Sequence, residues 1–231
     1  MHKYSHMSEI SKKFHELTRF DPSSASPDVK RMSMSEDSSA PSRKKYPRLK
    51  KVKLPKKDSI EILKNIYLEA LPGKPHLKRC IPDGVLSAIL CSATISTEAC
   101  PMEIYLIIQK AEKIEKGVYH YNAADHSLEL LSKDLVYTEL SKRELPHPWT
   151  ENATAMFLIT VIWDQIPPFP KEQGYRLALL GAGRLGQRLA VAARSLGIHA
   201  KISSDFIDQH VSEILDIESE TEIPLNMVTL E

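Results

Sequence analysis

Three closely spaced glycines in this chain have the spacing of a phosphate-binding loop. Gly181, Gly183 and Gly186 follow the short apolar run 177–180 and match the GxGxxG pattern, with Asp205 about where a ribose-binding acid would lie. In dinucleotide-binding folds, such glycines let the backbone approach a pyrophosphate at the start of a helix. The spacing taken alone therefore indicates NAD binding.

The surrounding sequence favours a different role for these glycines. A dinucleotide-binding half needs a βαβαβ stretch, whereas only 45 residues follow Gly186 in this 231-residue chain. The apolar run before the glycines is only four residues long and comes soon after the Pro-rich segment 167–170. We therefore predict that residues 175–196 form one core helix. Its glycines would let a neighbouring element approach closely, at a cost of about 1 kcal/mol each relative to alanine.

Other apolar patterns predict helices and strands in mixed order, which defines an α+β fold. Helical spacing and capping residues indicate further helices at 9–20, 58–70, 83–93 and 208–216. Apolar and β-branched runs indicate strands at 102–109, 155–162, 200–203 and 226–230, and a hairpin that joins 118–121 to 128–131. The predicted buried stripe of the 175–196 helix consists of Leu177, Leu180, Leu185, Leu189 and Ala192.

Charge is balanced over the whole chain but not along it. Lys and Arg number 31 against 30 for Asp and Glu, so no overall field draws the molecule to nucleic acid or membrane. Residues 43–57 nevertheless contain nine basic side chains and follow a Ser/Pro stretch, 23–42. We interpret them as a solvated linker, the alternative being a patch for nucleic acid or an acidic partner. The predicted organisation is a leader, 1–57, before one domain, 58–231.

The cysteines and the apolar runs indicate a cytoplasmic protein. Cys80, Cys91 and Cys100 lack CxxC spacing, which argues against a zinc site and a secreted disulfide framework and fits a reducing compartment. No apolar run approaches the length needed to cross a membrane, and the first residues lack the apolar segment of an export signal. We expect neither membrane insertion nor export.

Several segments together resemble one known family, the SagB-type dehydrogenases, which form the azoline oxidase branch of the nitroreductase superfamily. The resemblance covers nearly the whole chain and rests on the joint order of the segments. These are Phe-His-Glu-Leu-Thr-Arg at 14–19, Cys-Pro-Met-Glu-Ile-Tyr-Leu at 100–106, Gly-Val-Tyr-His-Tyr at 117–121, His-Ser-Leu-Glu-Leu at 126–130, Gly-Tyr-Arg at 174–176 and Glu-Ile-Pro-Leu at 222–225.

This resemblance implies a nitroreductase-like fold, in which a mostly antiparallel sheet is packed with helices in an intertwined homodimer. It also implies that FMN lies at the subunit interface and carries the redox chemistry by accepting a hydride. The implied substrate is an azoline in a modified peptide, oxidised to an azole and presented by a cyclodehydratase partner.

The resemblance also implies which residues contact the flavin. Relatives hold the flavin and its phosphate with an Arg-rich cluster, and residues 74–79 take its place here. Lys can pair with phosphate but lacks the two-pronged geometry of Arg. The Gly-Tyr-Arg motif and the loop after the 200–203 strand complete the set. The candidate cofactor contacts are Lys74, His76, Lys78, Arg176, Ser203 and Ser204.

Two departures from the family leave the catalytic residues unknown. The loop at 94–99 is shorter than the flavin-contacting loop of relatives, and Phe169-Pro170 stands where azoline oxidases place a Lys-Tyr pair. Loss of a positioned acid or base costs roughly 10²–10⁴-fold in rate. The sequence thus leaves three hypotheses: an FMN-dependent oxidoreductase, a flavin-free scaffold subunit of a peptide-modifying complex, and the NAD-binding protein indicated by the glycines.

Overall fold

A computed structural model of the chain describes residues 13, 44, 46–54, 80–93, 102–133, 153–165 and 171–231. Within these residues, no helix is long and apolar enough to cross a membrane. The helix predicted at 58–70 lies outside them, as does the one at 9–20 except for Lys13. The described helices and strands are β1 (Lys51–Lys53), α4 (Asp83–Ala93), β2 (Met102–Ile108), β3 (Gly117–Asn122), β4 (Ser127–Ser132), β5 (Ala155–Ile162), the 3₁₀ turn η1 (Trp163–Gln165), α7 (Lys171–Ser195), β6 (Ala200–Ser203), α8 (Asp208–Leu215) and β7 (Glu222–Leu230).

The strands form one seven-stranded sheet in the order β1-β4-β3-β2-β5-β7-β6, and every neighbouring pair is antiparallel. β2 and β5 lie at its centre and pair along their full length, from Met102 with Val161 to Ile108 with Ala155. Every residue of both strands is buried, as their continuous apolar runs require. The predicted α+β fold and its antiparallel sheet are confirmed.

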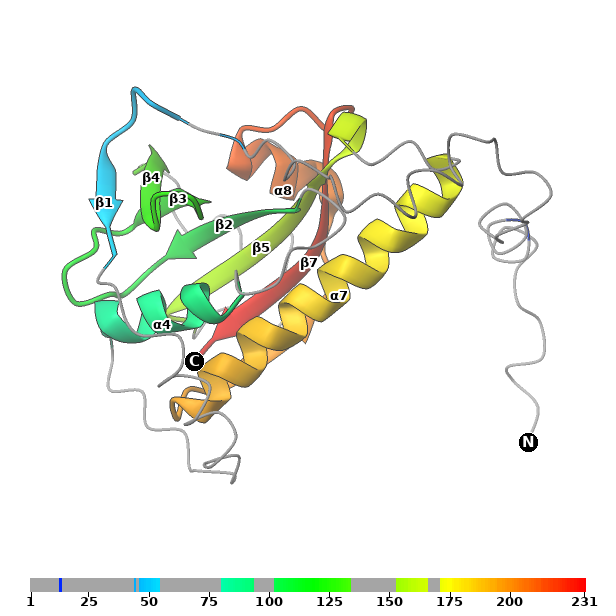
Figure 1. Cartoon of the computed structure of the whole chain (residues 1–231). Coiled ribbons are helices and arrows are strands. Elements are labelled where there is room, and N and C mark those ends of the chain that lie inside the picture. The colour runs from blue at the N-terminus through cyan, green and yellow to red at the C-terminus, as the bar shows by residue number, and fades with distance from the viewer. Residues whose placement is uncertain are drawn as a thin grey trace, which may run out of the picture.

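Helices cover the two faces of this sheet unequally. On one face, the long helix α7 runs beside β7 and packs against α4 (Figure 1). The larger hydrophobic cluster lies there and includes Leu106, Phe157 and Leu189. On the other face, the short helix α8 covers a smaller cluster that includes Tyr105 and Met227. Because successive residues of a strand point to opposite faces, β2, β3, β4, β5 and β7 each contribute to both clusters.

The predicted core helix is confirmed as α7, which begins four residues earlier than expected. All three glycines of the GxGxxG pattern lie inside it, and residues 177–180 are helical, so the NAD-binding hypothesis is wrong. The prediction of Leu180 in the buried stripe is also wrong, because its exposed fraction is 59%. Small side chains face the sheet instead, and Ala178 and Ala182 are buried at helical spacing with Leu185 and Leu189.

Two of the predicted boundaries differ from the structure for identifiable reasons. The basic segment predicted as a solvated linker supplies β1, whose three residues pair with β4 at the edge of the sheet. β7 begins at Glu222 rather than 226, although it contains Pro224. The register of β7 against β5 shifts between Ile159 and Thr160, and such a bulge accommodates a proline.

One glycine of α7 permits a close approach to the sheet. A Cβ atom on Gly186 would lie 2.6 Å from Asn226 Nδ2, and this amide donates a hydrogen bond of 3.2 Å to the carbonyl of Ala182. A Cβ atom on Gly183 would meet nothing within 4 Å. The close approach predicted from the sequence is therefore confined to Gly186.

These two glycines should respond to alanine with opposite signs. We expect Gly183→Ala to raise the free energy of unfolding by about 1 kcal/mol, through helix propensity alone. Gly186→Ala should lower the free energy of unfolding by about 1 kcal/mol. The methyl group would displace the Asn226 amide from its buried carbonyl partner, and the loss of that hydrogen bond outweighs the gain in helix propensity. Urea denaturation of both variants measures these changes. Equal stabilisation by both substitutions would contradict the close packing of α7 on β7.

Candidate functional site

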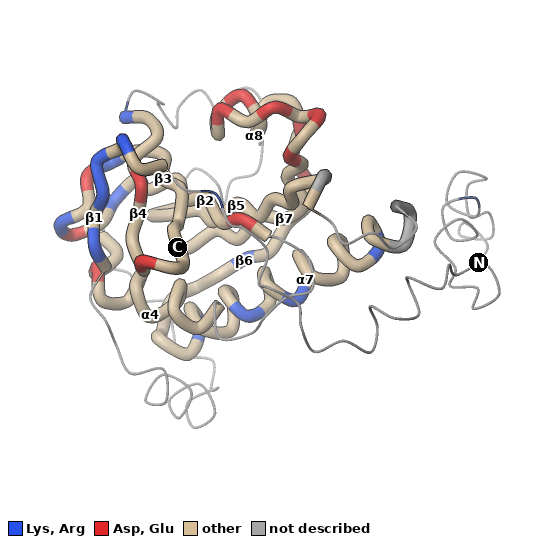
Figure 2. The backbone as a smooth tube through the Cα atoms, turned by 45° about the horizontal axis from the view of Figure 1, so that its top comes forward, with Lys and Arg blue, Asp and Glu red and all other residues tan. Residues whose placement is uncertain are grey.

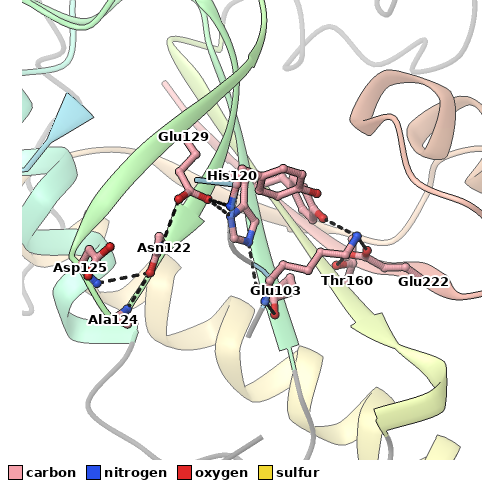
Figure 3. A network of polar contacts seen from close by, with 11 residues as sticks. Glu103, His120, Asn122, Ala124, Asp125, Glu129, Thr160 and Glu222 are labelled. Atoms are coloured by element: carbon pink, nitrogen blue, oxygen red, sulfur yellow. Dashed lines mark hydrogen bonds and ion pairs between the residues drawn. The ribbon is translucent and has the colours of Figure 1, made fainter. Parts of the chain in front are cut away.

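A cluster of polar side chains lies within the sheet, on the face that α8 covers. Its members are Glu103 of β2, His120 of β3, Glu129 of β4, Thr160 of β5 and Glu222 of β7, and each is 1% exposed or less. Figure 3 shows that they point toward one another across adjacent strands. Three carboxyl groups are thus buried together. Burial of charge is costly unless each group is paired and hydrogen-bonded, so their partners decide what the cluster can do.

His120 bridges two of these carboxyl groups. Its Nε2 lies 2.9 Å from an oxygen of Glu103, and its Nδ1 lies 3.1 Å from an oxygen of Glu129. An ionised carboxylate only accepts hydrogen bonds, so both ring nitrogens must donate. We predict on this geometry that His120 is the imidazolium cation, held between two carboxylates. The rings of Tyr46 and Tyr105 flank it, with centroids 5.1 Å away on each side.

Glu129 accepts the most hydrogen bonds of the three carboxylates. It accepts hydrogen bonds from Lys51 at 2.9 Å, from Asn122 at 3.2 Å and from the backbone N–H of Tyr46 at 3.0 Å. Burial alone would raise its pKa. The hydrogen bonds from Lys51, Asn122, His120 and Tyr46 outweigh burial and lower the pKa of Glu129 to about 2.

Glu222 forms the third buried pair, with Lys44. Lys44 donates to one oxygen of Glu222 and Thr160 donates to the other. Burial opposes the charge of Lys44, but the hydrogen bond and attraction to Glu222 outweigh it and raise the pKa of Lys44. Lys44 also lies 3.3 Å from the hydroxyl of Tyr105, whose pKa is raised by burial and by the negative charge of Glu222. The phenol therefore stays protonated.

All six oxygens of the three carboxylates accept at least one hydrogen bond. The backbone N–H of Lys44 serves the remaining oxygen of Glu103, at 3.0 Å. The cations that face the three carboxylates are His120, Lys44 and Lys51, so the formal charges cancel. Because the donors are engaged and the groups are buried, the cluster is an ion-pair network that fixes the sheet rather than a set of free acids and bases.

The described cofactor contacts predicted from the sequence lie on two elements, α7 and the end of β6. Arg176 lies near the start of α7, half-buried, next to Tyr175, whose ring centroid is 5.5 Å from that of Trp163. Ser203 ends β6, where its hydroxyl accepts a hydrogen bond of 3.1 Å from the backbone N–H of Asp205. Lys74, His76 and Lys78 lie outside the described residues.

The two described groups of contacts belong to different faces of the sheet. Ile202 packs into the cluster beneath α7, so the neighbouring Ser203 points to the opposite face. Arg176 belongs to α7 itself. Ser204 follows Ser203 and is exposed.

One further polar atom, close in sequence to Trp163, was not singled out from the sequence. Gln165 Oε1, in the η1 turn that carries Trp163, is buried and accepts no hydrogen bond from the part of the chain that the structure describes. The sequence offers little indication of this residue, because glutamine is common in the loops that follow apolar strands. The buried network had a clearer signal, since Glu103, His120 and Glu129 interrupt apolar strands.

Comparison with known proteins identifies the family. The model of the nitroreductase family matches residues 76–230, and the chain therefore belongs to that family. A Methanocaldococcus jannaschii protein named as a nitroreductase is 27% identical over 117 residues, which are 51% of this chain and 59% of that protein.

Solved structures show the same fold at low sequence identity. A nitroreductase from Anabaena variabilis superposes with a TM-score of 0.72 at 17% identity, covering 99% of this chain and 49% of that one. A chain of the E. coli microcin synthetase McbBCD complex, solved with truncated pro-MccB17 bound, superposes with a TM-score of 0.59 at 18% identity. The match covers 94% of this chain and 85% of that one. This chain thus spans about half the length of the Anabaena protein.

The described residues fit the chemistry of FMN, the cofactor that family members typically bind. Arg176 offers a cation for phosphate, and Ser203 and Ser204 offer hydroxyl and backbone donors. Gln165 offers an acceptor for the N–H of a flavin ring, which would satisfy its buried oxygen.

The lowered pKa of Glu129 predicts a specific acid dependence. Because the pKa in the folded state lies near 2 rather than at 4.5, ionised Glu129 stabilises the fold above pH 4.5, and this contribution is lost as the pH falls toward 2. Lys51→Met should raise the pKa of Glu129. Lys53→Met is the matched control, since Lys53 lies on the same strand and forms no ion pair among the described residues. Carboxyl ¹³C titration by NMR measures both, and a wild-type value near 4.5 would refute the network.

Proposed function

We propose that this protein is an FMN-dependent oxidoreductase of the SagB type. The observation that carries the proposal is membership of the nitroreductase family over residues 76–230, together with a fold that fits that family over nearly the whole chain. Bound FMN would supply the redox chemistry, by accepting or donating a hydride. The residues of the chain would bind and orient it.

Each described contact has a distinct role in this proposal. Arg176 pairs with the phosphate, and Gln165 accepts a hydrogen bond from the flavin ring. Contact between the rings of Trp163 and Tyr175 joins the segments that carry these two residues. Ser203 and Ser204 donate to the cofactor from the other face of the sheet. Lys74, His76 and Lys78 complete the phosphate contacts.

The placement of these contacts on two faces supports a homodimer. In one chain, Arg176 lies on α7, whereas Ser203 ends the edge strand β6 with its side chain on the face away from α7. Two copies related by a twofold axis can place Arg176 of one protomer opposite Ser203 of its partner. The flavin would then lie at the subunit interface.

The proposed substrate is an azoline in a peptide, presented by a cyclodehydratase partner. Support comes from the fold shared with a chain of the microcin synthetase complex, which was solved with a truncated precursor bound. We assign no catalytic residue, because Phe169-Pro170 stands at the position of the family's Lys-Tyr pair and lies outside the described residues.

The alternative is a flavin-free scaffold in the same kind of complex. Two observations favour it: no ionisable side chain stands at 169 or 170, and the buried acids and bases on the α8 face neutralise one another. On this alternative, the family fold is retained to hold partner proteins, and cytoplasmic assembly with a cyclodehydratase would be its whole role.

Flavin content separates the two functions. We expect the purified protein to be yellow and to release FMN on denaturation. Arg176→Met should weaken FMN binding about tenfold or more, because one charge-assisted hydrogen bond is lost. Arg184→Met is the matched control, since Arg184 lies two turns further along the same helix and is exposed. Flavin fluorescence titration of the apoprotein measures each affinity.

Two results would contradict this assignment in different ways. A protein that stays colourless and binds no FMN at saturating concentration would refute the flavin-dependent oxidoreductase. If Arg176→Met and Arg184→Met weaken FMN binding equally, Arg176 is not a specific flavin contact, although the protein still binds FMN.

The dimer has its own test. We expect light scattering at micromolar concentration to give twice the 26.1 kDa mass of one chain. Arg176→Met should leave that mass unchanged, because the variant alters a cofactor contact. A monomer that retains FMN would contradict the shared interface site.

A further inference from the structure

The segment just before β1 is held on the sheet mainly by charge. We call residues 44 and 46–50 the strap. None of its side chains is buried, whereas Leu54, just beyond β1, is 6% exposed and belongs to the core. The end of the segment near Leu54 is therefore anchored by apolar packing. The strap depends on other contacts.

Those contacts go to the three buried carboxylates. The backbone N–H groups of Lys44 and Tyr46 donate to Glu103 and Glu129, both at 3.0 Å. The Lys44 ammonium donates to Glu222. Figure 2 shows a group of basic residues around β1, with others along α7, while acidic residues follow α8 and reach β7. The strap thus connects the basic sheet edge at β1 to the face covered by α8, where the three carboxylates lie.

Lys44 completes the neutrality of the network. Without the strap, His120 and Lys51 leave the three carboxylates with one uncompensated negative charge. Glu222 would then keep only the hydroxyl of Thr160, and one oxygen of Glu103 would lose its donor. A buried carboxylate without a cation is strongly unfavourable, which gives the closed strap a specific driving force.

We propose that the strap is a charge-held latch, which opens and closes about β1 as a unit and is closed by the Lys44 ammonium on Glu222. Segments with few buried apolar contacts open locally at a lower free energy than the core. The strap meets this description, while β2 and β5 are buried along their whole length. Opening therefore leaves the sheet intact.

The latch controls how the N-terminal part of the chain is attached to the sheet. The 43 residues before Lys44 continue directly from the strap. With the latch closed, Lys44 lies beside Glu222 and Tyr105 on the α8 face. With the latch open, the strap is attached to the sheet only at β1, and the carboxylates become accessible.

Amide hydrogen exchange of the full chain tests the latch, and Lys44→Met is the decisive variant. The N–H of Tyr46 should exchange faster than that of Leu106, at the sheet centre, in the wild type. Lys44→Met should speed the exchange of Tyr46 about tenfold or more and leave Leu106 unchanged. Lys50→Met is the matched control, because Lys50 lies in the strap but pairs only with the exposed Glu115, at 3.5 Å. It should change the rate less than about threefold.

Two outcomes would overturn the latch. One is exchange of Tyr46 at the same rate as Leu106 in the wild type, because the strap would then open only with the whole domain. The other is an equal effect of Lys44→Met and Lys50→Met on Tyr46. If Lys44→Met does not fold, the wild-type comparison of Tyr46 with Leu106 decides alone.

Discussion

Burial of three carboxylates inside one face of a β-sheet is the constraint on which the arrangement of this protein depends. Glu103, Glu129 and Glu222 lie on different strands, and each needs donors that its own strand cannot supply. His120 supplies two of them from the strand between Glu103 and Glu129. Lys44, Tyr46 and Lys51 supply others from a segment at the edge of the sheet, and the side chains of Asn122 and Thr160 supply the remainder. The basic residues before the domain are therefore part of its fold.

The opposite face of the sheet is built on a different principle. There, α7 and α4 pack against a largely apolar surface, and a few polar contacts join the helices to the sheet, among them the Asn226 amide beside Gly186 and the bond from Arg194 to the carbonyl of Ala200. One face thus carries most of the hydrophobic stabilisation. The other face carries the charge network, which specifies strand order and register. A slip of one residue would turn Glu103 toward the apolar cluster.

The sequence allowed prediction of those elements whose signal is local. The continuous apolar runs of β2 and β5, the hairpin of β3 and β4, and the small-residue helix α7 follow from periodicity and length. Leu180 was placed on the wrong side because alanines, not leucines, face the sheet in that helix. β1 was missed because a short basic edge strand has the composition of a linker, and its strand character comes from pairing with β4.

The buried network was beyond sequence reasoning for a physical reason. Its members are brought together by the fold, and Lys44 and Glu222 are separated by 178 residues. Only the individual charged residues inside apolar strands could be noticed, not their partners. For the cofactor contacts, the resemblance named Arg176, Ser203 and Ser204, but local pattern could not reveal that they lie on two elements, α7 and the end of β6. This placement is why the proposed flavin site is coupled to a proposed dimer.

The central physical claim is that His120 is a buried imidazolium between two carboxylates. Nitrogen-15 NMR of the histidine ring measures this directly at neutral pH. We predict that both ring nitrogens of His120 carry slowly exchanging protons, with nitrogen shifts of the charged ring. A single N–H on a neutral ring would mean that one carboxyl is protonated instead, and the account of a balanced ionic network would fail.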